Sequence, residues 1–146
     1  MTPQAYRRAV RAVVASIPPG RVMSYGAIAA YLAEWSGRAA PRLVGHVMAI
    51  DGDGVPWHRV VRSDGRPARG LEARALRRLR DDGTPLRARA DAGPPDCVDM
   101  RAAAWAPDRP PAALLASEDG SEDRPRGSSG ASGASEGSGA SRASGA

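Results

Sequence analysis

The chain has 146 residues, enough for one domain with a modest core. Its net charge is +5, and all 21 basic side chains are arginines. Cys97 is the only cysteine, which excludes a disulfide within the chain, and His46 and His58 are too few for a zinc site. We therefore expect no metal and no cofactor. Apolar runs stay well short of the ~18 residues of a membrane span, and no signal segment opens the chain, so we expect a cytoplasmic protein.

Charge is distributed unevenly along the chain. Residues 1–90 hold 16 arginines against 7 acidic residues, a balance of +9, whereas residues 91–146 hold 5 against 9, a balance of −4. A basic front half favours a polyanionic partner, because neutralised phosphates release counterions. Residues 106–146 are rich in Pro, then in Gly, Ser and Ala, which predicts a disordered low-complexity tail after an ordered domain of residues 1–105.

Two helices are predicted at the front of the chain. The first covers residues 2–17, where Thr2 can cap it and a proline follows at the favoured first position. The sequence Pro18-Pro19-Gly20 then ends it. Ser24 is the cap candidate for a second helix, which runs as far as Gly37.

A third helix is predicted to begin at Ala40-Pro41 and to end in the loop Asp51–Gly54. Two short helices joined by a small turn match a helix-turn-helix pattern, although many helix pairs of this kind only build a core. The apolar side of the third helix is expected to contain Leu43, Val44, Val47, Met48 and Ile50.

The remaining predicted elements are short. Val60-Val61 is a strand candidate, followed by a turn at residues 63–65. A basic helix is predicted over residues 71–82 with its end at Gly83, and residues 97–105 form the last ordered segment. In the basic helix we expect Leu71, Ala75, Leu76 and Leu79 to face inward, and Arg74, Arg77, Arg78 and Arg80 to face largely outward.

The segment Pro56-Trp57-His58-Arg59-Val60 is the most informative motif. It resembles the Pro-Cys-His-Arg-Val signature of the O6-alkylguanine-DNA alkyltransferases, in which the cysteine takes the alkyl group. Residues 17–29 and 40–45 resemble the helix-turn-helix of the same family, and Asp82-Gly83 stands where the family has Glu-Gly. An indole has no nucleophilic lone pair at neutral pH, and covalent catalysis needs an activated nucleophile. The chain thus resembles the alkyltransferase-like proteins, which keep the damaged-base pocket and lose the transfer chemistry.

The resemblance implies both a fold and a function. The fold class would be α/β, a small, mostly helical domain with a helix-turn-helix, as in the C-terminal domain of the alkyltransferases. The function would be recognition of O6-alkylguanine in duplex DNA by minor-groove docking and base flipping, without alkyl transfer. The bound, bent DNA would flag the lesion for nucleotide excision repair proteins. We expect a monomer that has no membrane partner.

Several residues of the lesion pocket follow from the resemblance. Trp57 would form the floor of the pocket beside His58, and Tyr25 would help to rotate the 3′ phosphate of the target nucleotide. Arg69 is the candidate for a pocket cation, and Arg66 competes with it for that role. The sequence leaves the choice between these two arginines open.

Other residues are expected to contact DNA. Arg42 would enter the duplex and fill the gap left by the flipped nucleotide, and Tyr25 and Ser24 would lie at the phosphate backbone. Ala40 and Gly45 leave a small-residue face that a nucleic acid can approach closely. Gly45 in mid-helix could equally serve tight helix packing, at a cost of ~1 kcal/mol relative to alanine.

Two alternative functions remain open. In transferring members of the family, the residue at His58 belongs to a Cys–His–water–Glu relay, and Asp82 is one methylene shorter than that Glu, which would alter the relay. An enzyme, either an alkyltransferase or a DNA glycosylase, would therefore have to use another nucleophile, with Asp82 or Cys97 as candidates. A transcriptional regulator with a helix-turn-helix would instead bind DNA without regard to lesions.

Overall fold

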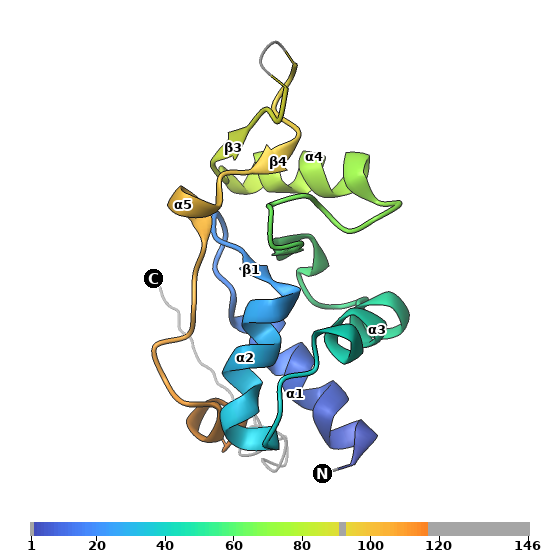
Figure 1. Ribbon diagram of the computed structural model, residues 1–146, viewed down its shortest axis with the longest axis vertical. Helices are drawn as coiled ribbons and strands as arrows, with labels where there is room; N and C mark the ends of the chain where they lie inside the picture. The colour runs from blue at the N-terminus through green and yellow to red at the C-terminus, as the bar shows by residue number, and fades with distance from the viewer. Residues whose placement is uncertain (1, 91–92, 117–146) are drawn as a thin grey trace, which may run out of the picture. The chain divides into compact units, whose positions relative to one another are not determined.

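The computed structural model describes residues 2–90 and 93–116 (Figure 1). The chain divides into two compact units, Met1–Pro111 and Ala112–Ala146, and the elements from α1 (Pro3–Ser16) to α5 (Met100–Ala103) all belong to the first. The predicted disordered tail begins at residue 106. Within it, residues 111–116 are helical, so the described structure continues past the predicted boundary at residue 105. The rest of the predicted tail, residues 117–146, lies outside the described residues.

The three helices predicted at the front of the chain are confirmed, together with the predicted caps of the first two. The Thr2 hydroxyl accepts a hydrogen bond from the Ala5 amide at 3.0 Å, and the Ser24 hydroxyl accepts one from Ala27 at 3.0 Å. Gly37 ends the second helix in the left-handed region, with φ of 88°. The helices are α1 (Pro3–Ser16), α2 (Tyr25–Ser36) and α3 (Pro41–Asp51).

A short parallel sheet connects the helices to the signature segment. In it β1 (Met23–Ser24) pairs with β2 (Val60–Val61), so that Met23 lies opposite Val60. The strand Val60–Val61 was predicted from the sequence, but its partner was not. A single 3-10 turn, η1 (Trp57–Arg59), leads directly into β2. Because Tyr25 follows β1 in the chain, this pairing brings the start of α2 beside the signature segment.

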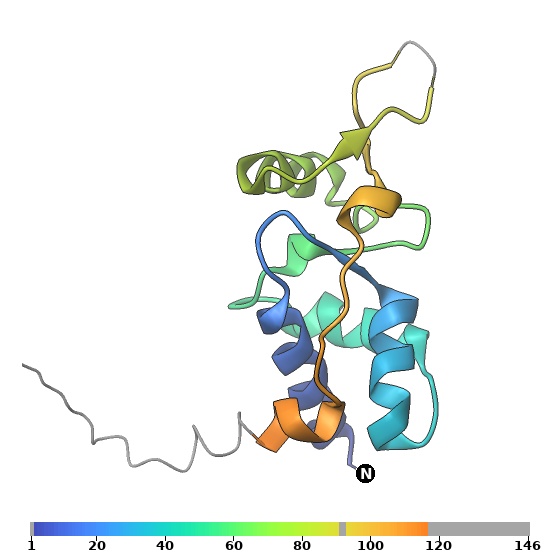
Figure 2. The ribbon, with the colours of Figure 1, turned by 90° about the vertical axis from the view of Figure 1, so that its left-hand side faces the viewer.

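The rest of the unit consists of four short elements. These are α4 (Glu72–Asp82), β3 (Leu86–Arg87), β4 (Cys97–Val98) and α5 (Met100–Ala103), and β3 pairs with β4 in antiparallel register. As predicted, Gly83 ends the basic helix with a φ of 78°. The chain after α5 runs back along the helices (Figure 2), where the Tyr31 hydroxyl donates to the Arg109 carbonyl at 2.8 Å.

The core has two parts. One buries the facing sides of α1, α2 and α3, which pack against one another; Val13, Ile28, Leu32 and Val44 are each fully buried there. The other is the cluster Val22, Val61, Leu79, Val98 and Ala103, which joins β2 to α4 and β4. No helix among the described residues combines the length and the apolar character needed to cross a bilayer.

Candidate functional site

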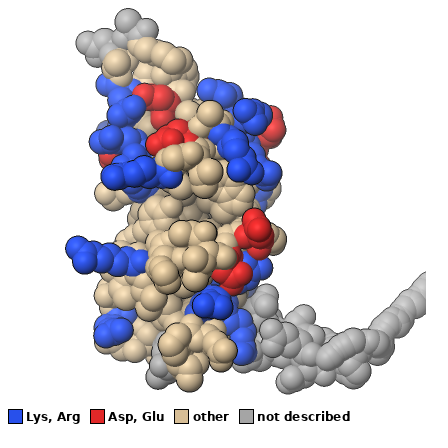
Figure 3. Space-filling view, turned by 90° about the vertical axis from the view of Figure 1, so that its right-hand side faces the viewer, with Lys and Arg blue, Asp and Glu red and all other residues tan. Residues whose placement is uncertain are grey.

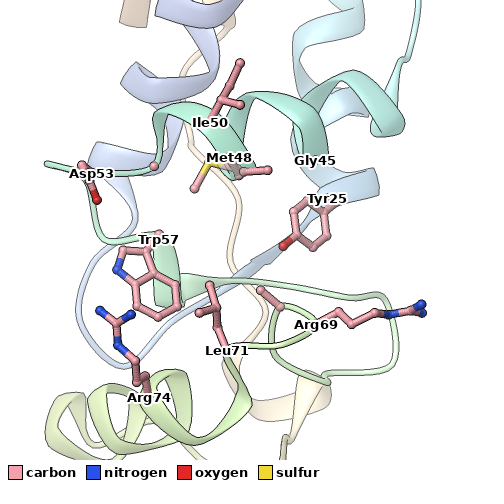
Figure 4. A pocket seen from close by; sticks show the side chains of 12 residues that line it. Tyr25, Gly45, Met48, Ile50, Asp53, Trp57, Arg69, Leu71 and Arg74 are labelled. Carbon is pink, nitrogen blue, oxygen red and sulfur yellow. The ribbon is translucent and has the colours of Figure 1, made fainter.

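A cavity of about 310 Å³ lies between α3, η1 and the start of α4 (Figure 4). Its lining residues come from distant parts of the chain: the β1–β2 pairing brings Tyr25 beside Trp57, α3 packs against α2, and α4 packs against η1. The lining residues are Tyr25, Gly45, Met48, Ala49, Ile50, Gly52, Asp53, Trp57, Ala68, Arg69, Leu71 and Arg74.

Trp57 forms one wall of this cavity, as expected from the sequence. It stands at the start of η1, where its carbonyl accepts the Val60 amide, and its side chain is half-buried. Two guanidinium groups of α4 lie over the indole: Arg74 Cζ is 5.5 Å and Arg78 Cζ is 5.6 Å from the ring centroid. Both distances fall within the ~6 Å range of a cation–π interaction. The nucleophile position of the family is therefore filled by an indole that the basic helix holds in place.

His58 does not line the cavity, and it instead ties the signature segment to the end of α4 through Asp82. Its side chain is buried, and Nε2 lies 2.9 Å from Asp82 Oδ2. Arg59 donates two hydrogen bonds to the same carboxylate, from Nε at 2.8 Å and from Nη2 at 3.1 Å, and also donates to the Ile17 carbonyl. Although His58 was expected in the lesion pocket, it is not among the lining residues, because the ion-pair network holds it on the inner side of η1.

The pKa of Asp82 and the pKa of His58 are both lowered, but for different reasons. The hydrogen bond from Arg59 lowers the pKa of Asp82, and the hydrogen bond from His58 adds to this effect. Burial lowers the pKa of His58 despite the opposing hydrogen bond to Asp82. The other ring nitrogen, Nδ1, is buried without a hydrogen-bond partner among the described residues. Asp82 therefore contacts the histidine directly, whereas the resemblance implied a water between these two positions.

The apolar side of the cavity corrects two predictions of core residues. Ile50 is 58% exposed and Leu71 is 39% exposed, although Leu71 was expected to face inward and Ile50 to lie on the apolar side of its helix. They are the two large apolar side chains recorded as exposed in the described part of the chain, and both line the cavity. Exposed apolar surface of this kind commonly marks a binding site. The helical periodicity was right, but it could not distinguish a core from a cavity wall.

The structure distinguishes between Arg69 and Arg66 as candidates for the pocket cation. Arg69 belongs to the cavity lining, and Figure 4 shows its guanidinium directed outward from the rim. Arg66 is instead held in an ion pair with Asp64 at 2.7 Å and does not line the cavity. Of the two candidates left open by the sequence, Arg69 is the one placed at the pocket.

The residues expected to contact DNA lie on α2 and α3 or at the N-caps of these helices. Arg42 is exposed in the first turn of α3, and Ala40 is the N-cap of that helix without a side-chain cap. Gly45 lines the cavity, and a Cβ built there would meet no atom within 4 Å, so tight helix packing does not explain this glycine. Ser24 caps α2. Burial raises the pKa of the Tyr25 hydroxyl, and the charge of Arg62 partly opposes the rise.

Sequence reasoning missed Arg11, which shapes the loop Asp51–Gly54. This side chain of α1 donates to the backbone carbonyls of Asp51 and Asp53, the latter at 2.9 Å. The contact spans some forty positions along the chain, so no local pattern could reveal it. Arg11 thereby fixes the loop that carries Gly52 and Asp53 into the cavity wall.

Four exposed arginines of α4 add positive charge near the site, beside Arg69 of the cavity lining. Figure 3 shows the face on which α3 and α4 lie: arginines gather over its upper part, and uncharged surface occupies its middle. Arg74, Arg77, Arg78 and Arg80 are all exposed, as predicted. Within residues 2–90 and 93–116, no three His, Cys, Asp or Glu side chains cluster in a way that could hold a metal ion.

Comparison with known proteins identifies relatives of this fold. The model of the family described as "6-O-methylguanine DNA methyltransferase, DNA binding domain" matches residues 5–84, more than half of the chain. The structure of S. pombe ATL in complex with DNA is 29% identical with a TM-score of 0.59. That of S. pombe Atl1 in complex with damaged DNA containing O6-carboxymethylguanine is 28% identical with a TM-score of 0.60. Each similarity covers 73% of this chain and 100% of the other. No curated protein gave a significant match.

The match to the family model includes α1 to α4 and the signature segment, and the similarity to the two S. pombe structures confirms the mostly helical fold predicted from the sequence. The residue that lies at the family's cysteine position is Trp57, in the wall of the cavity. The chain belongs to the family of the 6-O-methylguanine DNA methyltransferase DNA-binding domain and is an alkyltransferase-like protein.

Proposed function

We propose that the protein binds O6-alkylguanine in duplex DNA and leaves the alkyl group in place. The observation that carries this proposal is Trp57, an indole in the wall of the cavity at the position where the transferring relatives have their cysteine. An indole N–H donates a hydrogen bond but cannot attack an alkyl carbon. The cavity therefore retains a place for a base and lacks the group that would react with it.

Alternative nucleophiles are badly placed for transfer. Cys97 is fully buried in β4, next to the cluster that joins β4 to α4, and does not line the cavity. Asp82 lies behind η1, where Arg59 and His58 occupy its oxygens. A carboxylate stabilised in this way is a weak nucleophile, because attack would cost these interactions. Both arguments favour binding over an alkyltransferase or glycosylase reaction.

DNA would dock on the helix-turn-helix formed by α2 and α3, with α3 in the minor groove. Arg42 is exposed in the first turn of α3 and would fill the gap left by the flipped nucleotide. Flipping costs a few kcal/mol and is easiest for a weakly paired, damaged base. The excess of arginine in residues 1–90 would supply the sequence-independent part of the affinity. The S. pombe Atl1 structure in complex with damaged DNA supports damaged DNA as the partner.

A protein that binds a lesion without removing it must pass it to another process. We propose that the bound complex flags the lesion for nucleotide excision repair, since bent DNA with an extruded base is a distortion that other proteins can recognise. In this proposal the protein acts as a monomer.

The experiment is a gel-shift titration of two duplexes that differ only in O6-methylguanine or guanine at one position. It is combined with long incubation and analysis of both DNA and protein by mass spectrometry. We expect tighter binding to the lesion and an unchanged alkyl group. Equal affinity for the two duplexes would favour a transcriptional regulator. Stoichiometric loss of the methyl group, with adduct mass on the protein, would establish an enzyme.

A further inference from the structure

Two arginines of α4 form a cationic cover over the indole of Trp57. Arg74 and Arg78 are four residues apart and therefore lie on one face of the helix. Their guanidinium carbons stand 5.5 Å and 5.6 Å from the ring centroid, and Arg74 also lines the cavity. Figure 4 shows the Arg74 guanidinium beside the indole. Positive charge is thus concentrated at the end of the cavity that Trp57 closes.

This charge has no carboxylate partner among the described residues. The recorded ion pairs use other arginines, and both Arg74 and Arg78 are exposed. Asp53 is the one acidic residue in the cavity lining, and it belongs to the Asp51–Gly54 loop at another part of the wall (Figure 4). The N–H groups of the two guanidinium forks are therefore free to bind an anion.

The position of Trp57 indicates which part of a bound base would meet these arginines. In transferring relatives the residue at this position takes the alkyl group, so it must lie against the O6 substituent. If a flipped base enters the present cavity in the same orientation, its O6 substituent ends beside Trp57 and Arg74. This step rests on the function proposed above.

We propose that the cavity selects O6 substituents that carry a negative charge, with carboxyalkyl groups as the preferred class, and that Arg74 and Arg78 determine this selectivity. A guanidinium fork matches the two oxygens of a carboxylate and is more weakly hydrated than an ammonium group. The indole and Leu71 would exclude water from one side of the contact, which strengthens it beyond an exposed ion pair. A neutral substituent of the same size would leave the guanidinium groups without this partner.

The test compares O6-carboxymethylguanine with O6-carbamoylmethylguanine, its neutral isostere, in one duplex sequence. Fluorescence anisotropy gives both Kd values at fixed salt, with guanine as the reference duplex. The phosphate contacts are the same in both lesion duplexes, so the ratio of the two Kd values isolates the charge of the substituent. We expect the carboxylate to bind about tenfold more tightly, which corresponds to about 1.4 kcal/mol.

Matched variants show which side chains determine the preference for the charged substituent. Arg74→Gln should reduce the ratio to about one, and Arg78→Gln should reduce it in part. Arg77→Gln is the control, since Arg77 is exposed on the same helix, does not line the cavity and is not over the indole. It should lower all three affinities to the same extent and keep the ratio. Asp53→Asn removes the opposing charge of the lining and should raise the ratio.

The outcomes separate this inference from the proposed function. If both lesions bind more tightly than guanine but equally well, the charge selectivity is wrong and lesion binding stands. The same holds if the wild-type ratio persists in Arg74→Gln and Arg78→Gln. If neither lesion binds more tightly than guanine, the proposed function fails and the selectivity fails with it.

Discussion

Replacement of Gly45 by alanine should stabilise the protein and weaken its binding to DNA. Gly45 is the fifth residue of the 11-residue helix α3 and is not among the glycines with positive φ. A Cβ at this position would meet no atom within 4 Å. The fold therefore has no need of a glycine here, and the residue is half-buried on the wall of the cavity.

The two effects can be estimated separately. A glycine inside a helix costs about 0.8–1.0 kcal/mol relative to alanine, and Gly45→Ala should recover most of this. For a domain of this size such a gain raises Tm by roughly 3–6 °C. If DNA approaches α3 at Gly45, the added methyl group would displace the DNA and weaken the contacts made there, at a cost of about 1–2 kcal/mol if one hydrogen bond to a phosphate is lost. The affinity should then fall roughly tenfold.

Thermal unfolding followed by circular dichroism gives the change in Tm, and anisotropy titration with a lesion-containing duplex gives the change in DNA affinity. Ala15→Gly is the matched control, because Ala15 lies on the exposed side of α1, outside the proposed interface. It should lower Tm by a similar amount without a change in affinity. A raised Tm with unchanged affinity would refute close approach of DNA at Gly45, and an unchanged or lowered Tm would refute the packing argument.

Four further predictions concern other parts of the chain. Arg42→Ala should weaken binding to damaged and normal duplexes and reduce base flipping; an unchanged 2-aminopurine fluorescence signal would exclude the role in filling the gap. Acidification should destabilise the fold in two steps, because His58 and Asp82 both have a lowered pKa in the folded state and the unfolded chain binds more protons. The stability contributed by His58 is lost below about pH 6.5 and that of Asp82 below about pH 4; denaturation midpoints that stay constant from pH 7 to pH 3 would contradict this. Trp57→Cys should give little or no alkyl transfer, because the histidine is bound to Asp82 and loss of the indole leaves a void under Arg74; efficient methyl transfer by this single variant would overturn that reasoning. Removal of residues 117–146 should leave DNA affinity nearly unchanged, and a loss of lesion selectivity on truncation would show that the tail takes part in binding.

The sequence alone determined the four longer helices α1 to α4 and the identity of the signature segment. Thr2, Ser24, Gly37 and Gly83 act within one turn of their own helix, so their effect can be read from neighbouring residues. The replacement of cysteine by Trp57 is likewise visible without coordinates, because the chemistry of a side chain at a known motif position does not depend on the rest of the chain.

Only the tertiary structure decided which residues surround that tryptophan. The parallel pairing of Met23 with Val60 joins segments far apart in the chain, and two-residue strands leave too weak a pattern to reveal it. Periodicity grouped Ile50 and Leu71 with the apolar residues of their segments, but whether such residues meet a core or a cavity depends on what packs opposite. The same holds for Arg74 and Arg78, which the sequence placed on a solvated helix face: packing of α4 against η1 set them over Trp57. Contacts of this kind depend on long-range packing, which local sequence patterns do not encode.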